Sequence, residues 1–234
     1  MTPTAAEYLA QNRGGGLFTE TVNQRIGAYL CVVAYRLGLA PTVLTIANLV
    51  LGVGGSVLVG VLAPRMHDGD VPAAVVGLAA LVLWQLAYSL DCADGQLARV
   101  TGRAGPAGAR VDILADVALQ ISLVAAVATV AHEYTPNLPT WLAAAFAGTW
   151  MVNLVTSVLQ QGASAASLVS SRSTAVRVVK LVRDYGAVVT GIALVIAFAP
   201  HWTVWLMSAF LVVNGGFLVA SIAMAARTGL TRRT

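Results

Sequence analysis

The chain has 234 residues, of which 58% are hydrophobic and only 10% are charged. A soluble domain carries about 25% charged residues and could not bury this much apolar surface, so the composition argues against a soluble globular protein. The net charge of +4 comes from basic residues scattered between apolar runs, a pattern of membrane topology and not of nucleic-acid binding.

The first 40 residues form a leader that precedes the apolar spans. Residues 1–25 carry charged side chains and lack a short apolar core, so we expect no cleavable signal peptide. Apolar residues then recur near helical spacing over 17–38, while residues 20–25 are mainly polar. This pattern predicts an amphipathic helix that lies on the membrane surface, with an ordinary solvated leader as the alternative.

Six apolar runs follow, several of which approach or exceed the roughly 20 residues that cross a bilayer as a helix. Short breaks that contain proline or charged residues separate them. The pattern predicts an all-α integral membrane protein with six transmembrane helices in one bundle over 41–226. No repeat is apparent, so residues 1–234 are expected to form a single domain. The predicted spans are 42–63, 72–94, 108–131, 139–160, 183–200 and 203–226.

Basic residues predict the orientation of this bundle. If the N-terminus is cytoplasmic and the chain crosses six times, thirteen of the 14 Lys and Arg residues fall on the cytoplasmic side and Arg65 alone falls outside. Cytoplasmic loops are rich in Lys and Arg, so both termini and the loops after the second and fourth spans are predicted to be cytoplasmic. Cys31 and Cys92 lie in or beside predicted helices, and no disulfide is expected.

Four of the ten acidic residues lie close together, at the cytoplasmic ends of the second and third spans. Asp91 and Asp94 are three residues apart and Asp112 and Asp116 are four apart, so each pair projects from one face of its helix. A short loop joins the two helices, which should pack antiparallel and bring the carboxylates together. A charged aspartate at the centre of a span costs about 2.5–3.5 kcal/mol, so a compensating partner is expected.

Divalent metal ions are the partner that this arrangement predicts. Carboxylates this close repel unless cations lie between them. Their hard oxygen atoms suit Mg²⁺, Mn²⁺ or Ca²⁺, whereas zinc prefers His and Cys, and two bridged metals recur in phosphoryl chemistry. Gly95 and Gly108 would let a ligand approach the backbone, and Arg99 can meet a phosphate. The alternative is that the glycines are helix ends and Arg99 is a membrane anchor.

The segment 91–116, DCADGQLARVTGRAGPAGARVDILAD, resembles the signature of the CDP-alcohol phosphotransferase (CDP-alcohol phosphatidyltransferase) family. That signature reads D-x-x-D-G-x-x-A-R, eight residues, then G-x-x-x-D-x-x-x-D. The six spans and the surface helix are also similar to the family, so the resemblance extends over the whole chain. Every signature position is matched: Asp91, Asp94, Gly95, Ala98, Arg99, Gly108, Asp112 and Asp116.

The resemblance implies a metal-dependent transferase of phospholipid biosynthesis. The four aspartates would hold two ions, Mg²⁺ or Mn²⁺, and Asp116 would also be the base that deprotonates the acceptor hydroxyl. The acceptor oxygen would attack in line, and CMP would leave. The CDP part of the donor would lie against Gly95, Ala98, Arg99, Gly108, Thr42 and Thr45.

Two positions depart from the family pattern. Members often carry Ser or Thr three residues before the second glycine, where this chain has Gly105, so one nucleotide contact is missing. Many members begin the first span with Pro-Asn, where this chain has Pro41 and Thr42, followed by Thr45. Both departures concern the donor site and leave the metal site intact.

The acceptor and the donor are less well defined. CDP-diacylglycerol is favoured as donor because most small six-span members use it, and a soluble donor such as CDP-inositol is the alternative. A homodimer is left open. A basic stripe in the loop after the fourth span would bind a phosphorylated acceptor such as glycerol phosphate or inositol phosphate, with anchoring to anionic lipids as the alternative. The stripe comprises Arg172, Arg177, Lys180 and Arg183.

Two other classes fit parts of the pattern. A divalent cation transporter would also place aspartates within the membrane, but it would need them near the bilayer centre and in both halves of a repeat. Here they gather at one cytoplasmic end. A non-catalytic scaffold would not need a complete site. The sequence therefore favours the enzyme.

Overall fold

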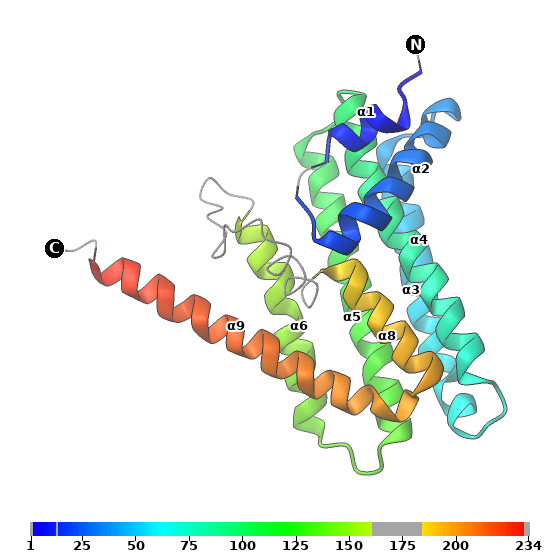
Figure 1. Ribbon diagram of the computed structural model, residues 1–234, viewed down its shortest axis with the longest axis vertical. Helices are drawn as coiled ribbons and strands as arrows, with labels where there is room; N and C mark the ends of the chain where they lie inside the picture. The colour runs from blue at the N-terminus through cyan, green and yellow to red at the C-terminus, as the bar shows by residue number, and fades with distance from the viewer. Residues whose placement is uncertain (1, 13, 161–183, 232–234) are drawn as a thin grey trace.

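The computed structural model describes residues 2–12, 14–160 and 184–231, and every regular element within these ranges is helical (Figure 1). The predicted all-α class is therefore confirmed. Each of the six apolar runs corresponds to one long or medium helix. These helices are α3 (Pro41–His67), α4 (Ala73–Val100), α5 (Pro106–Tyr134), α6 (Thr140–Gln160), α8 (Tyr185–Phe198) and α9 (Thr203–Thr231).

Within the described ranges, four stretches are long and apolar enough to cross a membrane: α3, α4, α5 and Pro200–Ala220, which comprises η3 (Pro200–Trp202) and most of α9. α8 has 14 residues, about 21 Å at the usual helical rise, and the hydrocarbon core is about 30 Å thick. α6 has 21 residues, of which Thr140–Val152 is the apolar stretch found among the residues whose side chains are described. The chain is thus a multi-pass membrane protein, and the count of six spans stays a prediction.

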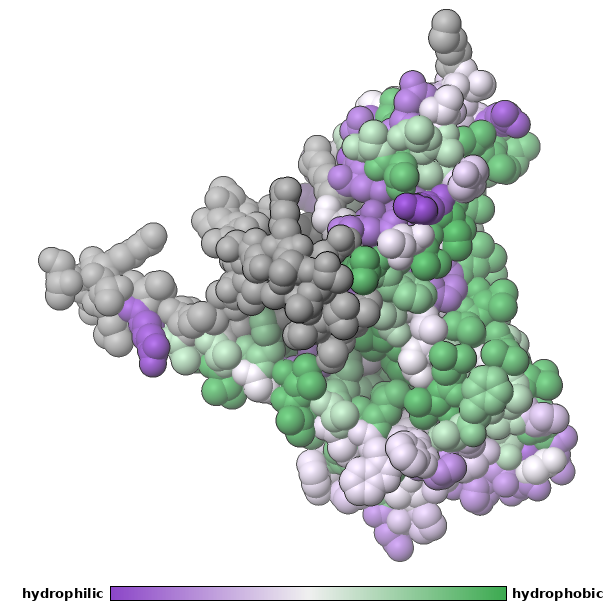
Figure 2. Space-filling model, in the orientation of Figure 1, coloured by the Kyte–Doolittle hydropathy of each residue, from purple (hydrophilic) through white to green (hydrophobic). Residues whose placement is uncertain are grey.

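The surface of the bundle has the polarity of a membrane protein. Figure 2 shows hydrophobic residues over the middle of the helices and hydrophilic residues toward the two ends. Val50 and Val61 on α3 and Val82 on α4 expose 63%, 68% and 65% of their surface. Valines this exposed would be unfavourable in water, whereas in a bilayer they face lipid.

The predicted N-terminal helix over 17–38 is present as two consecutive elements, the π-helix η1 (Thr19–Asn23) and α2 (Gln24–Arg36). One face of α2 is buried against α4, where Cys31 donates a hydrogen bond to the carbonyl of Ala93. The opposite face exposes Tyr29 and Val33, both apolar. α2 is therefore amphipathic in the sense that the sequence predicted, and its outward face is suited to a membrane surface.

A shorter helix, α1 (Ala5–Ala10), was not predicted. Thr4 and Glu7 form a capping box at its start: the Glu7 backbone N–H donates to the Thr4 hydroxyl, and the Thr4 backbone N–H donates to the Glu7 carboxylate at 2.6 Å. The hydrogen bonds that the Glu7 carboxylate accepts from the Thr4 backbone N–H and hydroxyl lower the pKa of Glu7. α1 packs on α2 through Tyr8, which is fully buried.

A buried carboxylate fastens the N-terminal elements to α8. Asp184, immediately before α8, is 4% exposed. It accepts the backbone N–H groups of Phe18 and Thr19 at 2.8 and 3.1 Å and the Thr19 hydroxyl at 2.5 Å. The Thr19 hydroxyl also lies 3.1 Å from that of Tyr88 on α4. Residues 165 positions apart in the sequence are therefore held together at one corner of the bundle.

Small residues let the central helices approach closely. α3 makes its most extensive contacts with α4 and α5. A side chain at Gly55 would meet the Trp84 ring at 3.0 Å, and one at Gly52 would overlap Leu119. Helix pairs in membranes depend on such small residues because lipid provides no hydrophobic drive for association. The α3–α4–α5 unit carries the candidate site.

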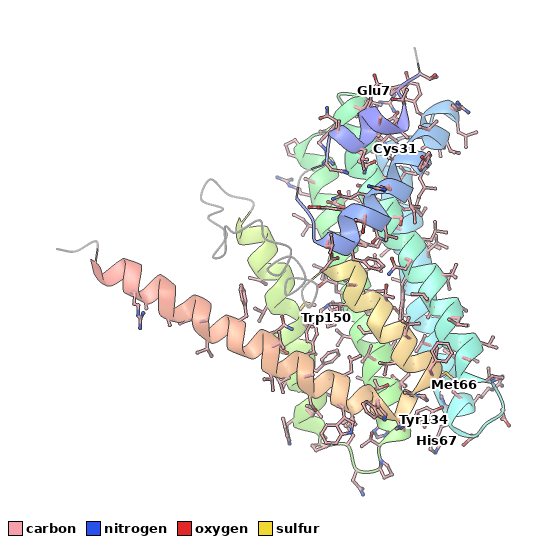
Figure 3. The ribbon with its side chains drawn as sticks, in the orientation of Figure 1. Glu7, Cys31, Met66, His67, Tyr134 and Trp150 are labelled. Atoms are coloured by element: carbon pink, nitrogen blue, oxygen red, sulfur yellow. The ribbon has the colours of Figure 1, made fainter. Side chains whose placement is uncertain are left out.

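The end of the bundle opposite α1 is closed by aromatic contacts. His67 at the end of α3 meets the Tyr134 ring edge-on, with centroids 5.2 Å apart (Figure 3). This contact joins the ends of α3 and α5 that lie far from the aspartate segment, which is at the other end of α5. Nearer the middle of the molecule, Trp150 on α6 stacks on Phe210 of α9 at 4.5 Å (Figure 3).

Candidate active site

The candidate site lies where α4 ends and α5 begins. The chain turns sharply because the backbone N–H groups of Arg103 and Ala104 both donate to the carbonyl of Ala98, at 2.8 and 3.1 Å. Gly102 has a φ of 68°, a conformation that favours glycine. Pro106 then takes the first position of α5, where no backbone N–H is needed. This turn reverses the direction of the chain, and α4 and α5 then both pack on α3 and not closely on each other.

Three of the four predicted carboxylates converge across this turn. Asp91 and Asp94 on α4 and Asp112 on α5 have carboxylate oxygens within 4.8 Å of one another. Asp94 is buried, and the other two are partly buried. Asp116, one turn further along α5, interacts electrostatically with both Asp91 and Asp94. The helical spacing that the sequence showed is therefore realised as a cluster of negative charge.

Two side chains of α3 reach this cluster from a third direction. The Thr45 hydroxyl donates to Asp94 at 2.5 Å, and the Asn48 amide donates to Asp91 at 3.2 Å. Thr45 was predicted to contact the donor, and the structure also gives it this bond to a carboxylate. Asn48 was missed: it is polar, in an apolar run, three residues after Thr45, but the sequence does not show which helix it faces.

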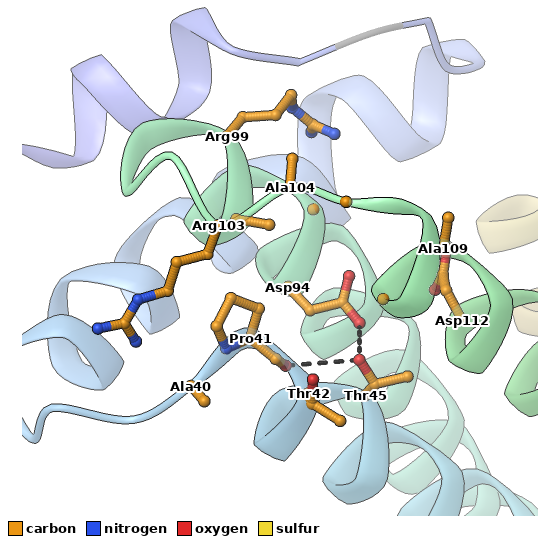
Figure 4. A pocket seen from close by; sticks show the side chains of 14 residues that line it. Ala40, Pro41, Thr42, Thr45, Asp94, Arg99, Arg103, Ala104, Ala109 and Asp112 are labelled. Carbon is orange, nitrogen blue, oxygen red and sulfur yellow. Dashed lines mark hydrogen bonds between the residues drawn. The ribbon is translucent and has the colours of Figure 1, made fainter.

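A cavity of about 360 Å³ opens beside Asp94 and Asp112. This is within the range of small-molecule sites, about 300–1,000 Å³. Figure 4 shows Thr45 and Arg99 on opposite sides of Asp94 in this view. All six residues predicted to contact the CDP donor line the cavity: Thr42, Thr45, Gly95, Ala98, Arg99 and Gly108. It is also lined by residues that were not predicted: Ala40, Pro41, Arg103, Ala104, Gly105 and Ala109.

The three glycines of the segment differ in what a side chain at each position would meet. A side chain at Gly95 would come within 3.0 Å of the Arg99 guanidinium, so glycine leaves room for the arginine to lie against the helix. A side chain at Gly108 would meet nothing within 4 Å and would project into open space. Gly105 precedes α5 and lines the cavity, and a side chain there would also meet nothing within 4 Å.

One aromatic residue from outside the segment also approaches the cluster. Tyr185, the first residue of α8, interacts electrostatically with Asp116 and Asp91, and its ring meets that of Tyr88 edge-on at 4.8 Å. No sequence signal pointed to Tyr185. The four basic residues predicted to bind the acceptor lie outside the described residues: Arg172, Arg177, Lys180 and Arg183.

The donor set of the cluster fits a hard divalent cation. Its converging atoms are carboxylate oxygens from two helices, and hydrogen bonds from α3 hold two of those carboxylates in place. Oxygen ligands of this kind suit Mg²⁺ or Mn²⁺. Both cysteines are free thiols, and burial raises the pKa of Cys31 to about 12, so that thiol stays neutral and is a poor metal ligand.

Fold and site together define a multi-pass helical membrane protein with a carboxylate-lined cavity at one end of its bundle. The CDP-alcohol phosphatidyltransferase family model matches residues 38–225, which run from the start of α3 into α9 and include every residue of the carboxylate cluster. The chain therefore belongs to the CDP-alcohol phosphatidyltransferase family, whose members transfer substituted phosphate groups. A search of curated proteins gave no match.

Proposed function

We propose that this protein transfers a phosphatidyl group from a CDP-linked lipid to an alcohol, with release of CMP, as a step of phospholipid biosynthesis. The observation that carries the proposal is the cavity itself. Its wall contains two of the carboxylates, two arginines and a glycine-lined backbone. Anionic pyrophosphate would be matched by the arginines, and the carboxylates suit the metal ions that such a donor binds.

Asp91, Asp94, Asp112 and Asp116 are the proposed metal ligands, for two Mg²⁺ or Mn²⁺ ions. When bound, these ions would neutralise the pyrophosphate and the charge that develops during transfer. Arg99 and Arg103 would meet the phosphates from the other side of the cavity. The backbone at Gly95 and Gly108 would allow the nucleotide to come close, with Thr42 and Ala98 beside it.

Asp116 is the proposed general base. It lies one turn beyond Asp112, is partly buried and does not line the nucleotide cavity, and we propose that the acceptor reaches it from the side away from the nucleotide. Its carboxylate would take the proton of the acceptor hydroxyl. The acceptor oxygen would then form a bond to the lipid-linked phosphorus, while the bond from that phosphorus to CMP breaks. The basic residues from Arg172 to Arg183 are proposed to hold a phosphate on the acceptor, such as glycerol phosphate or inositol phosphate.

An apolar groove supports a lipid donor over a soluble one. It has a volume of about 190 Å³ and lies between α3 and α5, lined by Ile46, Leu49 and Val111 among others. Thr45 lines both this groove and the nucleotide cavity, so the two are adjacent. Ile46 is 54% exposed in a helix that is apolar enough to span the membrane. We propose that an acyl chain of the donor lies in this apolar groove beside the nucleotide cavity, whereas CDP-inositol has no apolar chain that would occupy it.

The direct test measures CMP release by the purified protein with CDP-diacylglycerol or CDP-inositol and a panel of alcohols. We expect CMP only with the lipid donor and a matching acceptor. EDTA should abolish release, and Mg²⁺ or Mn²⁺ should restore it. Full turnover in chelator would refute the metal-dependent mechanism, and equal turnover of CDP-inositol would refute the lipid donor.

A further inference from the structure

In the side-chain amide of Asn48, the NH₂ group has a hydrogen-bond partner and the oxygen has none. The residue is 1% exposed, within α3. Its Nδ2 donates to the Asp91 carboxylate at 3.2 Å, while Oδ1 is buried with no hydrogen-bond partner. A buried acceptor without a partner is destabilising, and the great majority of buried polar groups have one.

The orientation of this amide is chemically determined. Asp91 accepts hydrogen bonds, so only the NH₂ group of Asn48 can face it. Turning the amide over would place two acceptor oxygens against each other and leave the NH₂ group without its partner. Oδ1 is therefore fixed in place, and it belongs to a side chain that already contacts the carboxylate cluster.

The neighbours of Asn48 in the cluster cannot satisfy this oxygen. Carboxylates are acceptors, and Thr45 directs its hydroxyl to Asp94. An amide oxygen next to carboxylates can be satisfied by a cation or by a water molecule that a cation polarises. A neutral amide oxygen also adds a ligand without adding charge, whereas a fifth carboxylate would increase the repulsion within the cluster.

We propose that Asn48 belongs to the cation site: its N–H group fixes the Asp91 carboxylate, and its Oδ1 serves as a neutral oxygen ligand for the cation held there. The proposal rests on the metal site of the proposed function. With this ligand, α3 would contribute to the cation site together with α4 and α5.

The test is Mn²⁺ binding by the purified protein without substrate, with free Mn²⁺ followed by electron paramagnetic resonance. Asn48→Leu removes the donor and the oxygen at similar volume and should weaken Mn²⁺ binding about 10- to 100-fold, as losses next to metal ligands do. Asn48→Asp keeps an oxygen, so it should bind Mn²⁺ more tightly than Asn48→Leu. Asn48→Asp loses the N–H bond to Asp91 but keeps an oxygen, so rescue relative to Asn48→Leu would show that an oxygen at this position, and not that bond, supports Mn²⁺ binding.

Asn214→Leu is the matched control. Asn214 is also 1% exposed in an apolar helix, its Nδ2 donates to a carbonyl, and its Oδ1 is likewise orphaned, but it faces a cavity lined by apolar residues such as Ile192 and Phe210. It should bind Mn²⁺ like the wild type. Thermal unfolding in EDTA identifies any variant that fails to fold.

The outcomes are distinguishable. Wild-type affinity in Asn48→Leu, or equally weak binding in Asn48→Leu and Asn48→Asp, would overturn the role of Asn48 alone. A wild-type protein that binds no Mn²⁺ would overturn the metal site of the proposed function itself.

Discussion

Thr45 offers a sharp test of how the carboxylate cluster is held. Its hydroxyl donates to Asp94 at 2.5 Å, and both residues are buried. Thr45→Val keeps the shape of the side chain, creates no cavity and removes the donor. A hydrogen bond to a charged group contributes about 1.5–3 kcal/mol, or roughly 10- to 150-fold in an equilibrium constant.

This loss should appear as weaker metal activation. In Thr45→Val, Asp94 loses the hydrogen bond that orients its carboxylate, so the Mg²⁺ concentration for half-maximal CMP release should rise by about 10- to 150-fold. Thr45→Ser retains a hydroxyl and should stay close to the wild type. The assay is CMP release against Mg²⁺ concentration at saturating donor.

Thr129→Val is the matched control. The Thr129 hydroxyl donates to the Ala125 carbonyl of its own helix, on the exposed surface of α5, so its removal should leave metal activation unchanged. If Thr45→Val keeps the wild-type Mg²⁺ midpoint and changes only the KM of the CDP donor, the hydroxyl acts on the nucleotide, and the role assigned to the Asp94 hydrogen bond is wrong.

Three further predictions concern the base, the cavity and the topology. Asp116→Asn should lower CMP release by about 10²–10⁴-fold while Mn²⁺ binding persists on the remaining carboxylates, and near wild-type turnover would show that Asp116 is not the base. Gly108→Leu should raise the KM of the donor without lowering thermal stability, because its side chain enters open cavity space; an unchanged KM would exclude the nucleotide from this wall. A cysteine at Thr234 should be labelled from the cytoplasm and one at Asp68 from outside, and the reverse would invert the proposed orientation.

Much of the candidate site is local in the sequence and was therefore predictable. Asp91 and Asp94, like Asp112 and Asp116, are one helical turn apart, so their shared faces follow from helix geometry alone. The short turn between α4 and α5 reverses the chain, but the two helices do not pack closely on each other as the sequence predicted, because both pack mainly on α3. Six of the eight signature residues line one cavity, and Asp91 and Asp116 belong to the carboxylate cluster beside it. The apolar runs likewise predicted the six helices of the bundle.

The contacts between distant segments could not be predicted in this way. Thr45 and Asn48 are two polar residues in an apolar run, and only the packing of α3 against α4 directs them to Asp94 and Asp91. In the sequence Asp184 is an acid at the edge of a span, whereas in the fold it accepts three hydrogen bonds from the N-terminal segment.

The difference between what could and could not be predicted follows from how far along the chain each interaction acts. Hydropathy and helical periodicity act over one or two turns, so the sequence by itself determined the helices, their polarity and the spacing of the acidic pairs. Which faces meet depends on small residues such as Gly52 and Gly55, whose fit against Leu119 and Trp84 exists only in three dimensions. Tertiary structure alone therefore decided that α3 supplies the polar groups that hold the carboxylates.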